Sequence, residues 1–131
     1  MKVFVDENLS PALAKALNAL FAGEHEVVHI RERFGPRVED KVWIERMSED
    51  GRWVVLSGDR RISRSRATQA AFRNSRLIGF FLASALNAAR VTTQMQRLLA
   101  LWEDIEAISK SVAGGSMYEV PIKGKIRQLR S

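Results

Sequence analysis

The apolar residues of this chain fall into short blocks that alternate between strand-like and helix-like spacing. The segment from Lys2 to Val5 alternates and ends in acid, which predicts a short strand leading into a loop. Ser10 and Pro11 are typical of a helix start, with serine as the N-cap and proline at the first helical position. This helix should end at Gly23, and its residues expected to pack on a sheet are Leu13, Leu17, Leu20, Ala12 and Ala16.

The rest of the chain continues the alternation. The pattern predicts a strand over 26–30, a loop over 31–38, a helix over 40–50, a strand over 53–56, a helix over about 64–74, a strand over 77–82 and a long helix over 92–112. In the helix over 40–50, the residues expected to face inward are Val42 or Trp43, Ile44 and Met47. Residues 118–122 and 125–129 predict a closing strand or a hairpin, with Pro121 tolerated only at an edge.

Strands that alternate with helices predict one α/β domain over residues 1–131. The apolar run from Trp53 to Leu56 is typical of a central parallel strand covered on both faces. A chain of 131 residues is long enough for a single domain with its own core. We therefore expect a three-layer α/β/α sandwich with a central, mainly parallel sheet.

Composition limits the cellular compartments in which this domain is expected. The chain has no cysteine, which excludes disulfides and Cys-ligated zinc and fits a reducing compartment. The apolar opening is interrupted at once by Asp6 and Glu7, which argues against a signal peptide. The most apolar stretch, from Leu77 to Ala89, is shorter than the ~20 residues that span a bilayer. We expect a soluble, cytoplasmic protein that does not bind a membrane.

The charge is unevenly distributed along the chain. The net charge is +6, from 21 Lys and Arg against 15 Asp and Glu. No acid occurs between Arg60 and Trp102, a stretch that carries Arg60, Arg61, Arg64, Arg66, Arg73, Arg76, Arg90 and Arg97. Because arginine matches the geometry of phosphate, this tract favours a nucleic-acid partner. The alternatives are a solvated basic surface and contact with an acidic protein.

Acidic residues stand where the predicted strands end. Asp6 and Asp59 each follow an apolar strand, and Asp40 opens a helix. Because the carboxyl ends of parallel strands meet at one edge, these three carboxylates are candidates for a shared site. Oxygen ligands of this kind suit Mg²⁺ or Mn²⁺. The alternative for each acid alone is a helix cap or a turn.

Three segments carry a resemblance to a known family. The opening VFVDENLSPAL, then EDKVWIERM, then GRWVVLSGDRRI resemble a PIN-like domain. The nearest group is the small PIN-like family that includes the toxins of VapBC-type toxin–antitoxin pairs. The first half of the chain matches motif by motif, and from Leu77 onward the resemblance rests on the order of the elements.

The resemblance implies a Mg²⁺- or Mn²⁺-dependent endoribonuclease, the toxin of a type II pair whose partner is a cognate antitoxin. Its pattern places the catalytic and metal-binding acids at Asp6, Asp40 and Asp59, with the adjacent Glu7 as a further metal ligand and Glu39 as a helper. A metal-activated water would hydrolyse the RNA phosphodiester and leave a 5′-phosphate and a 3′-hydroxyl. The candidate substrate-binding residues are Asn8, Ser57, Arg60, Arg61 and Arg64.

This chain departs from the family pattern in one respect. PIN nucleases usually carry a further acid after the third one, and here none occurs before Glu103. This departure leaves open a non-catalytic module that binds nucleic acid or protein. A receiver-type phosphoacceptor domain is a third alternative, although Lys123 is a poor match for the lysine it needs.

Several conspicuous residues are expected to be structural. His25 and His29 are the only histidines, and without cysteine they do not make a zinc site. The tryptophans and the Phe80–Phe81 pair should anchor the core, the tryptophans being Trp43, Trp53 and Trp102. Leu101 lies off the main stripe of the long helix, which makes it a candidate for a homodimer surface.

Overall fold

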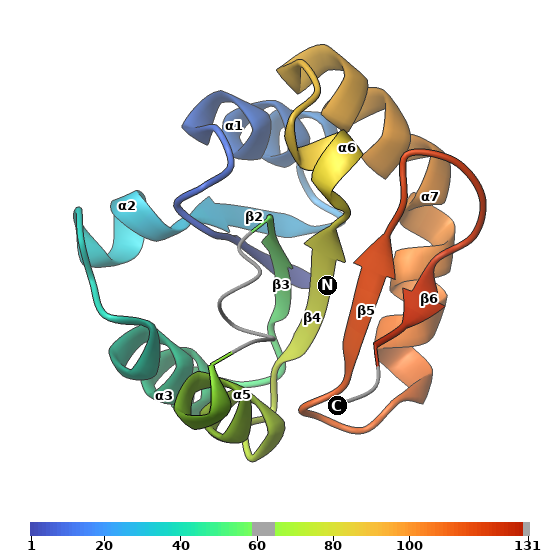
Figure 1. Ribbon diagram of the computed structural model, residues 1–131. Coiled ribbons are helices and arrows are strands. Elements are labelled where there is room, and N and C mark those ends of the chain that lie inside the picture. The colour runs from blue at the N-terminus through green and yellow to red at the C-terminus, as the bar shows by residue number, and fades with distance from the viewer. Residues whose placement is uncertain (59–64, 130–131) are drawn as a thin grey trace.

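The chain folds as six strands and six helices over the residues that the computed structural model describes, 1–58 and 65–129 (Figure 1). The strands are β1 (Lys2–Val5), β2 (Glu26–His29), β3 (Val54–Ser57), β4 (Ile78–Leu82), β5 (Met117–Val120) and β6 (Arg127–Gln128). The helices are α1 (Pro11–Leu20), α2 (Ile30–Phe34), α3 (Asp40–Asp50), α5 (Arg66–Arg73), α6 (Ser84–Asn87) and α7 (Val91–Ser111).

All the strands join one sheet in the order β2-β1-β3-β4-β5-β6. The pairs from β2 through β5 are parallel, and β6 is antiparallel to β5. The chain moves outward from β1 to β2 and then crosses back to place β3 on the other side of β1. The strand order therefore reverses between β1 and β3, and in open α/β sheets the crevice at the carboxyl ends of such strands is where ligands bind.

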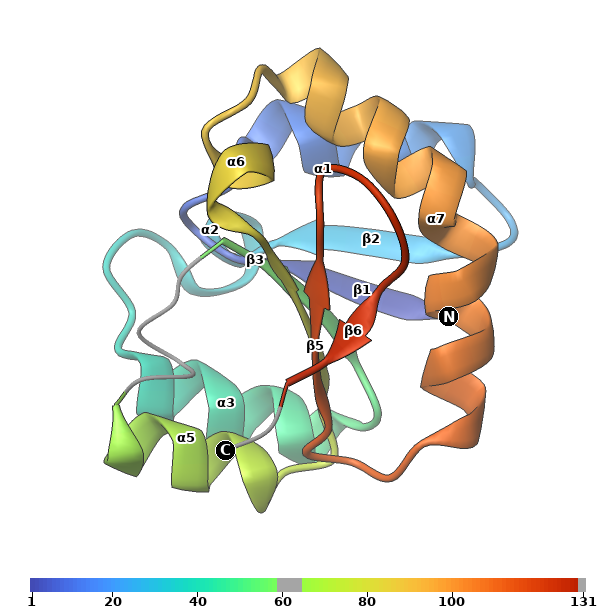
Figure 2. The same cartoon turned by 45° about the vertical axis from the view of Figure 1, so that its right-hand side comes forward.

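Helices cover both faces of this sheet (Figures 1 and 2). α1, α6 and α7 lie on one face, and α3 and α5 lie on the other, with α2 beside them. Each strand divides its side chains between the two cores, because successive residues point to opposite faces. Val3 and Val5 pack in the core under α1 and α7, and Phe4 packs in the core under α3.

The structure confirms the α/β/α sandwich with a mainly parallel sheet. Ser10 caps α1, since its Oγ accepts a hydrogen bond from the backbone N–H of Ala12 at 3.1 Å. The C-terminal segment forms the hairpin alternative, and Pro121 lies just after β5. The expected anchors are buried in the core: Trp43, Trp53, Trp102, Phe80 and Phe81.

Two short helices were not predicted. The segment over 31–38 was expected to be a loop, but α2 begins at Ile30, inside the strand expected to reach that residue. His29 explains the early start, because its Nδ1 accepts the backbone N–H of Arg31 at 3.2 Å and so caps the helix. The other helix, α6, turns the chain between β4 and α7.

Some predicted packing faces were wrong. Leu20 is 58% exposed, and Ala12 and Ala16 are exposed as well. α1 buries a narrower stripe, formed by Leu13, Ala14 and Leu17.

Leu101 is buried rather than available as a dimer surface, with an exposed fraction of 7%. Its neighbours in the buried stripe of α7 are Leu98, Trp102 and Ile105. Leu101 lies three residues after Leu98 and four before Ile105, so it faces the core together with them. In α3 it is Trp43 that packs inward, while Val42 is 39% exposed.

Within the described ranges, no helix combines the length and the apolarity needed to cross a bilayer.

Candidate active site

Asp6 lies directly after β1, at the carboxyl edge where the strand order reverses. Its backbone N–H donates to the carbonyl of Leu56 in β3 at 2.9 Å, which continues the pairing of the two strands by one residue. Its side chain is almost fully buried, with the residue 4% exposed. The carboxylate accepts the backbone N–H of Glu7 on Oδ1 at 2.7 Å and the hydroxyl of Ser57 on Oδ2 at 2.9 Å. A buried charge needs such donors, and they fix its orientation.

Asn8 joins the loop after β1 to the loop after β3. The backbone N–H of Gly58 donates to Oδ1 of Asn8 at 3.1 Å. Ser57 is fully buried at the end of β3, and its hydroxyl points to Asp6. The structure therefore brings together Asp6, Asn8 and Ser57, which sequence analysis had assigned to one site from three separate positions.

Asn87 is a member of this edge that sequence analysis missed. It ends α6, just beyond β4, and its side chain packs directly against Gly58. A Cβ atom placed on Gly58 would lie 2.0 Å from Oδ1 of Asn87, so position 58 accepts only glycine while Asn87 keeps this place. Oδ1 of Asn87 is buried and has no hydrogen-bond partner among the residues that the structure describes. The signal in the sequence was a polar residue shortly after the apolar run that forms β4.

His29 supports the loop that carries Asp6. It is fully buried at the end of β2, and its Nε2 donates to the carbonyl of Leu9 at 2.8 Å. The tautomer follows from the other ring nitrogen, because Nδ1 accepts the N–H of Arg31. Both nitrogens are thus used within the fold, in line with the structural role expected for His29.

Glu7 and Asp40 also lie near strand or helix ends but are engaged elsewhere. Glu7 forms an ion pair with Arg31 at 3.2 Å between Oε1 and Nε. Asp40 is the first residue of α3 and is half-buried. Its Oδ1 accepts the indole N–H of Trp43 at 3.0 Å. Among residues 1–58 and 65–129, no three His, Asp or Glu side chains are placed to hold a metal ion. Asp59, Arg60, Arg61 and Arg64 lie outside the described residues.

This edge carries oxygen donors of the kind that hard cations prefer. It presents a carboxylate at Asp6, a hydroxyl at Ser57 and an amide oxygen at Asn87. Mg²⁺ and Mn²⁺ take oxygen ligands of these kinds, and Mg²⁺ is commonly bound through only one or two carboxylates. The orphaned oxygen of Asn87 is an atom that such an ion or its water would satisfy. In donor type, these residues fit a divalent metal.

Comparison with known proteins gives a family for the chain. The family model described as "PIN like domain" matches residues 1–84, from β1 into the start of α6. Neither the curated proteins nor the solved structures that were searched contain a match. The matched part includes Asp6, Asp40 and Ser57, and Asn87 lies just past its end. PIN domains are generally nucleases, so the family supports a nuclease-related function at the coarse level. With more than half of its length matched, the chain belongs to the PIN-like domain family.

Proposed function

We propose that this protein is a Mg²⁺- or Mn²⁺-dependent endoribonuclease and the toxin of a type II toxin–antitoxin pair. The observation that carries the proposal is the buried carboxylate of Asp6, held by Ser57 where the strand order of a PIN-like domain reverses. The family match favours this class over a receiver-type phosphoacceptor domain. The cognate antitoxin, the homodimer and the cytoplasmic location remain predictions.

In the proposed reaction the chain's own residues hold and orient the substrate. Asp6, Asp40 and Asp59 would hold the metal, with Glu7 and Asn87 as neighbouring oxygen ligands. A bound divalent ion supplies an activated water and stabilises the charge that develops on the phosphate. Arg60, Arg61 and Arg64 would contact the phosphates of the strand, which gives affinity that depends on salt more than on sequence.

Asn8 and Ser57, which were expected to bind the substrate, also make contacts within the fold. In the structure Asn8 Oδ1 accepts from Gly58, and Ser57 donates to Asp6. We propose that these two residues position the acid and the β3 loop.

Metal binding tests the proposal first. Carboxylates gathered at one edge repel one another, so Mn²⁺ should raise the melting temperature by about 4–6 °C at a concentration tenfold above its Kd. Asp6→Asn and Asp59→Asn should each remove most of this gain. Asp104→Asn is the matched control, since Asp104 is exposed on α7, and it should keep the full gain. A wild-type melting curve that Mn²⁺ leaves unchanged contradicts a metal-dependent enzyme.

Cleavage of end-labelled RNA tests the reaction itself. Wild type with Mn²⁺ should give products with a 5′-phosphate, and loss of any one metal-binding acid should lower the rate by at least about 100-fold. The departure from the family pattern supports one competing function, because no acid follows Asp59 before Glu103. A chain that binds RNA but neither binds metal nor cleaves would be a non-catalytic PIN-like module.

A further inference from the structure

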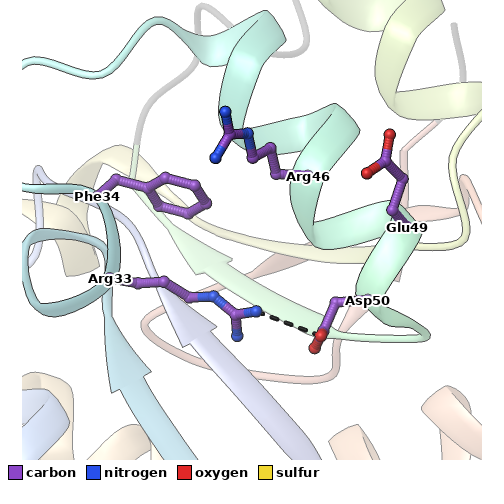
Figure 3. Close-up of a pocket in the computed structure, with 5 residues that line it drawn as sticks. All are labelled: Arg33, Phe34, Arg46, Glu49 and Asp50. Carbon is purple, nitrogen blue, oxygen red and sulfur yellow. Dashed lines mark ion pairs between the residues drawn. The ribbon is translucent and has the colours of Figure 1, made fainter.

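A polar pocket lies on the α3 face of the sheet, in the groove between α2 and α3. Its volume is about 370 Å³, at the lower end of the range for small-ligand sites. Figure 3 shows side chains from both walls: Arg33 and Phe34 come from α2, and Arg46, Glu49 and Asp50 come from α3. None of these residues belongs to the site at the carboxyl edge.

On one side of the pocket the charged groups are already paired. Arg33 forms an ion pair with Asp50, with 3.3 Å between Nη2 and Oδ1. The guanidinium carbon of Arg33 lies 5.4 Å from the centroid of the Trp53 ring, in cation–π contact. The indole N–H of Trp53 donates to Oδ2 of Asp50 at 2.7 Å. These contacts lock Arg33 and Asp50 to the core and leave a preformed wall.

The other polar groups of the pocket are uncommitted. The side chains of Arg46 and Glu49 are exposed and form no hydrogen bond or ion pair with any residue in the described ranges. Phe34 is half-buried and packs edge-on against Phe4, with 6.0 Å between the ring centroids. The pocket thus offers an aromatic ring, a cation and a carboxylate around one space (Figure 3).

We propose that this pocket binds an unpaired guanine base of the RNA strand, an inference that rests on the proposed ribonuclease function. Unpaired RNA bases stack on aromatic side chains and are recognised through hydrogen bonds along their Watson–Crick edge. Guanine carries a ring N–H and an amino group side by side on that edge, and the paired oxygens of Glu49 match these donors. Phe34 stacks on the base, and Arg46 contacts the adjacent phosphate.

Its position along α3 suits a site for a neighbouring nucleotide. Arg46 lies six residues after Asp40, which is about 9 Å along the helix axis. A strand held near Asp40 would cover this distance within a few nucleotides. The net charge of +6 favours a polyanion over a peptide as the occupant. The phosphate contacts do not depend on RNA sequence, and the pocket would add a preference for guanine.

Fluorescence anisotropy with labelled pentanucleotides in EDTA tests the inference without cleavage. Wild type should bind UUGUU about tenfold more tightly than UUAUU, UUCUU or UUUUU. Glu49→Gln should reduce this preference to less than about twofold, because an amide cannot accept both donors. Glu45→Gln is the matched control: Glu45 is exposed on the same helix, lies outside this pocket, and should keep the preference.

A second pair of variants separates base contact from phosphate contact. Arg46→Ala should weaken binding of all four RNAs equally and lower the salt slope by about one. Lys15→Ala on α1 removes the same charge from the opposite face of the sheet and should leave binding unchanged.

The outcomes distinguish this inference from the proposed function. Equal binding of the four RNAs by wild type, or a guanine preference that survives Glu49→Gln, overturns the pocket assignment and leaves the ribonuclease proposal standing. No binding of any RNA in EDTA overturns the inference, and the cleavage assay with Mn²⁺ then decides the ribonuclease proposal by itself. Binding of an acidic pentapeptide that Arg46→Ala weakens, without a preference among the RNAs, would mark the pocket as a protein contact and overturn the inference.

Discussion

Asp6 shows how much of this site depends on single hydrogen bonds. A carboxylate that is 4% exposed is expensive to bury unless donors surround it. The structure supplies the N–H of Glu7, the next residue, and the hydroxyl of Ser57, which lies 51 positions away in the chain. The local donor comes with the turn after β1, whereas the distant one exists only because β1 and β3 are neighbours.

The Ser57 hydroxyl should therefore contribute measurably to stability. Ser57→Ala removes a hydrogen bond to a buried charge, and we expect the free energy of unfolding to fall by about 1.5–3 kcal/mol. Urea denaturation of both proteins at pH 7 measures the change. Ser84→Ala, at an exposed position, should change stability by less than about 0.5 kcal/mol. If Ser57→Ala leaves the free energy of unfolding unchanged, the hydroxyl does not support the charge of Asp6.

Asp50 links stability to pH. The indole N–H of Trp53, followed by the hydrogen bond and charge of Arg33, holds the pKa of the Asp50 carboxyl below its ordinary value of 3.8. A carboxyl whose pKa is lower in the folded state binds protons more weakly there than in the unfolded chain. Its stabilising contribution is therefore complete above pH about 4 and is lost as the pH falls through the lower folded pKa.

Asp50→Asn should then destabilise the protein at pH 7 and lose this effect in strong acid. Urea denaturation of wild type and variant at pH 7, 5, 3 and 2 measures the difference, which should shrink only below pH about 4. Asp104→Asn, which changes an exposed acid on α7, is the control. A difference that stays constant from pH 7 to pH 2 contradicts a lowered pKa at Asp50.

At the scale of elements, the connection after β3 and the short helix α6 fit together as a pair. Gly58 has no side chain, and the Asn87 amide occupies the space where a Cβ would lie. Gly58→Ala should destabilise the fold by about 1–3 kcal/mol, because a packed neighbour must move. In the Asn87→Ala background the same substitution should cost much less, since the clash is gone. A double-mutant cycle by urea denaturation measures this coupling.

Gly23→Ala serves as a comparison for that cycle. Gly23 has open space around it but a φ of +87°, so its replacement costs backbone strain and is independent of Asn87. Additive effects of Gly58→Ala and Asn87→Ala would show that the two residues do not meet in solution.

Short elements were also where sequence reasoning failed. The long helix α7 has a strong helical period, and the strands β3 and β4 are continuous apolar runs. The predicted bounds of all three lie within two residues of the structure. α2 is five residues long and α6 is four, too short for a hydrophobic period to show. α2 is instead determined by a cap from His29, whose other ring nitrogen bonds to Leu9.

For the whole molecule, charge predicts how binding should respond to salt. A net charge of +6 with an acid-free arginine tract favours contacts to phosphates. If about four phosphates of a single strand are neutralised, raising salt from 50 to 200 mM should weaken RNA binding by about 50-fold. Anisotropy titrations with a labelled single-stranded RNA measure the slope, and uncharged crowding agents should not reproduce the loss. A flat salt response would exclude phosphate contact as the main source of affinity.

The sequence by itself determined the sandwich, the family and the positions of Asp6, Asp40 and Ser57 at the ends of elements. These features follow from hydrophobic periods and short motifs, which are local along the chain. Only the tertiary structure decided that Ser57 supports Asp6 and that Asn87 lies against Gly58. It also decided that the Arg33–Asp50 ion pair lines a pocket together with Arg46. Such contacts join residues far apart in sequence, and they depend on the strand order and on how each helix packs. Periodicity encodes neither.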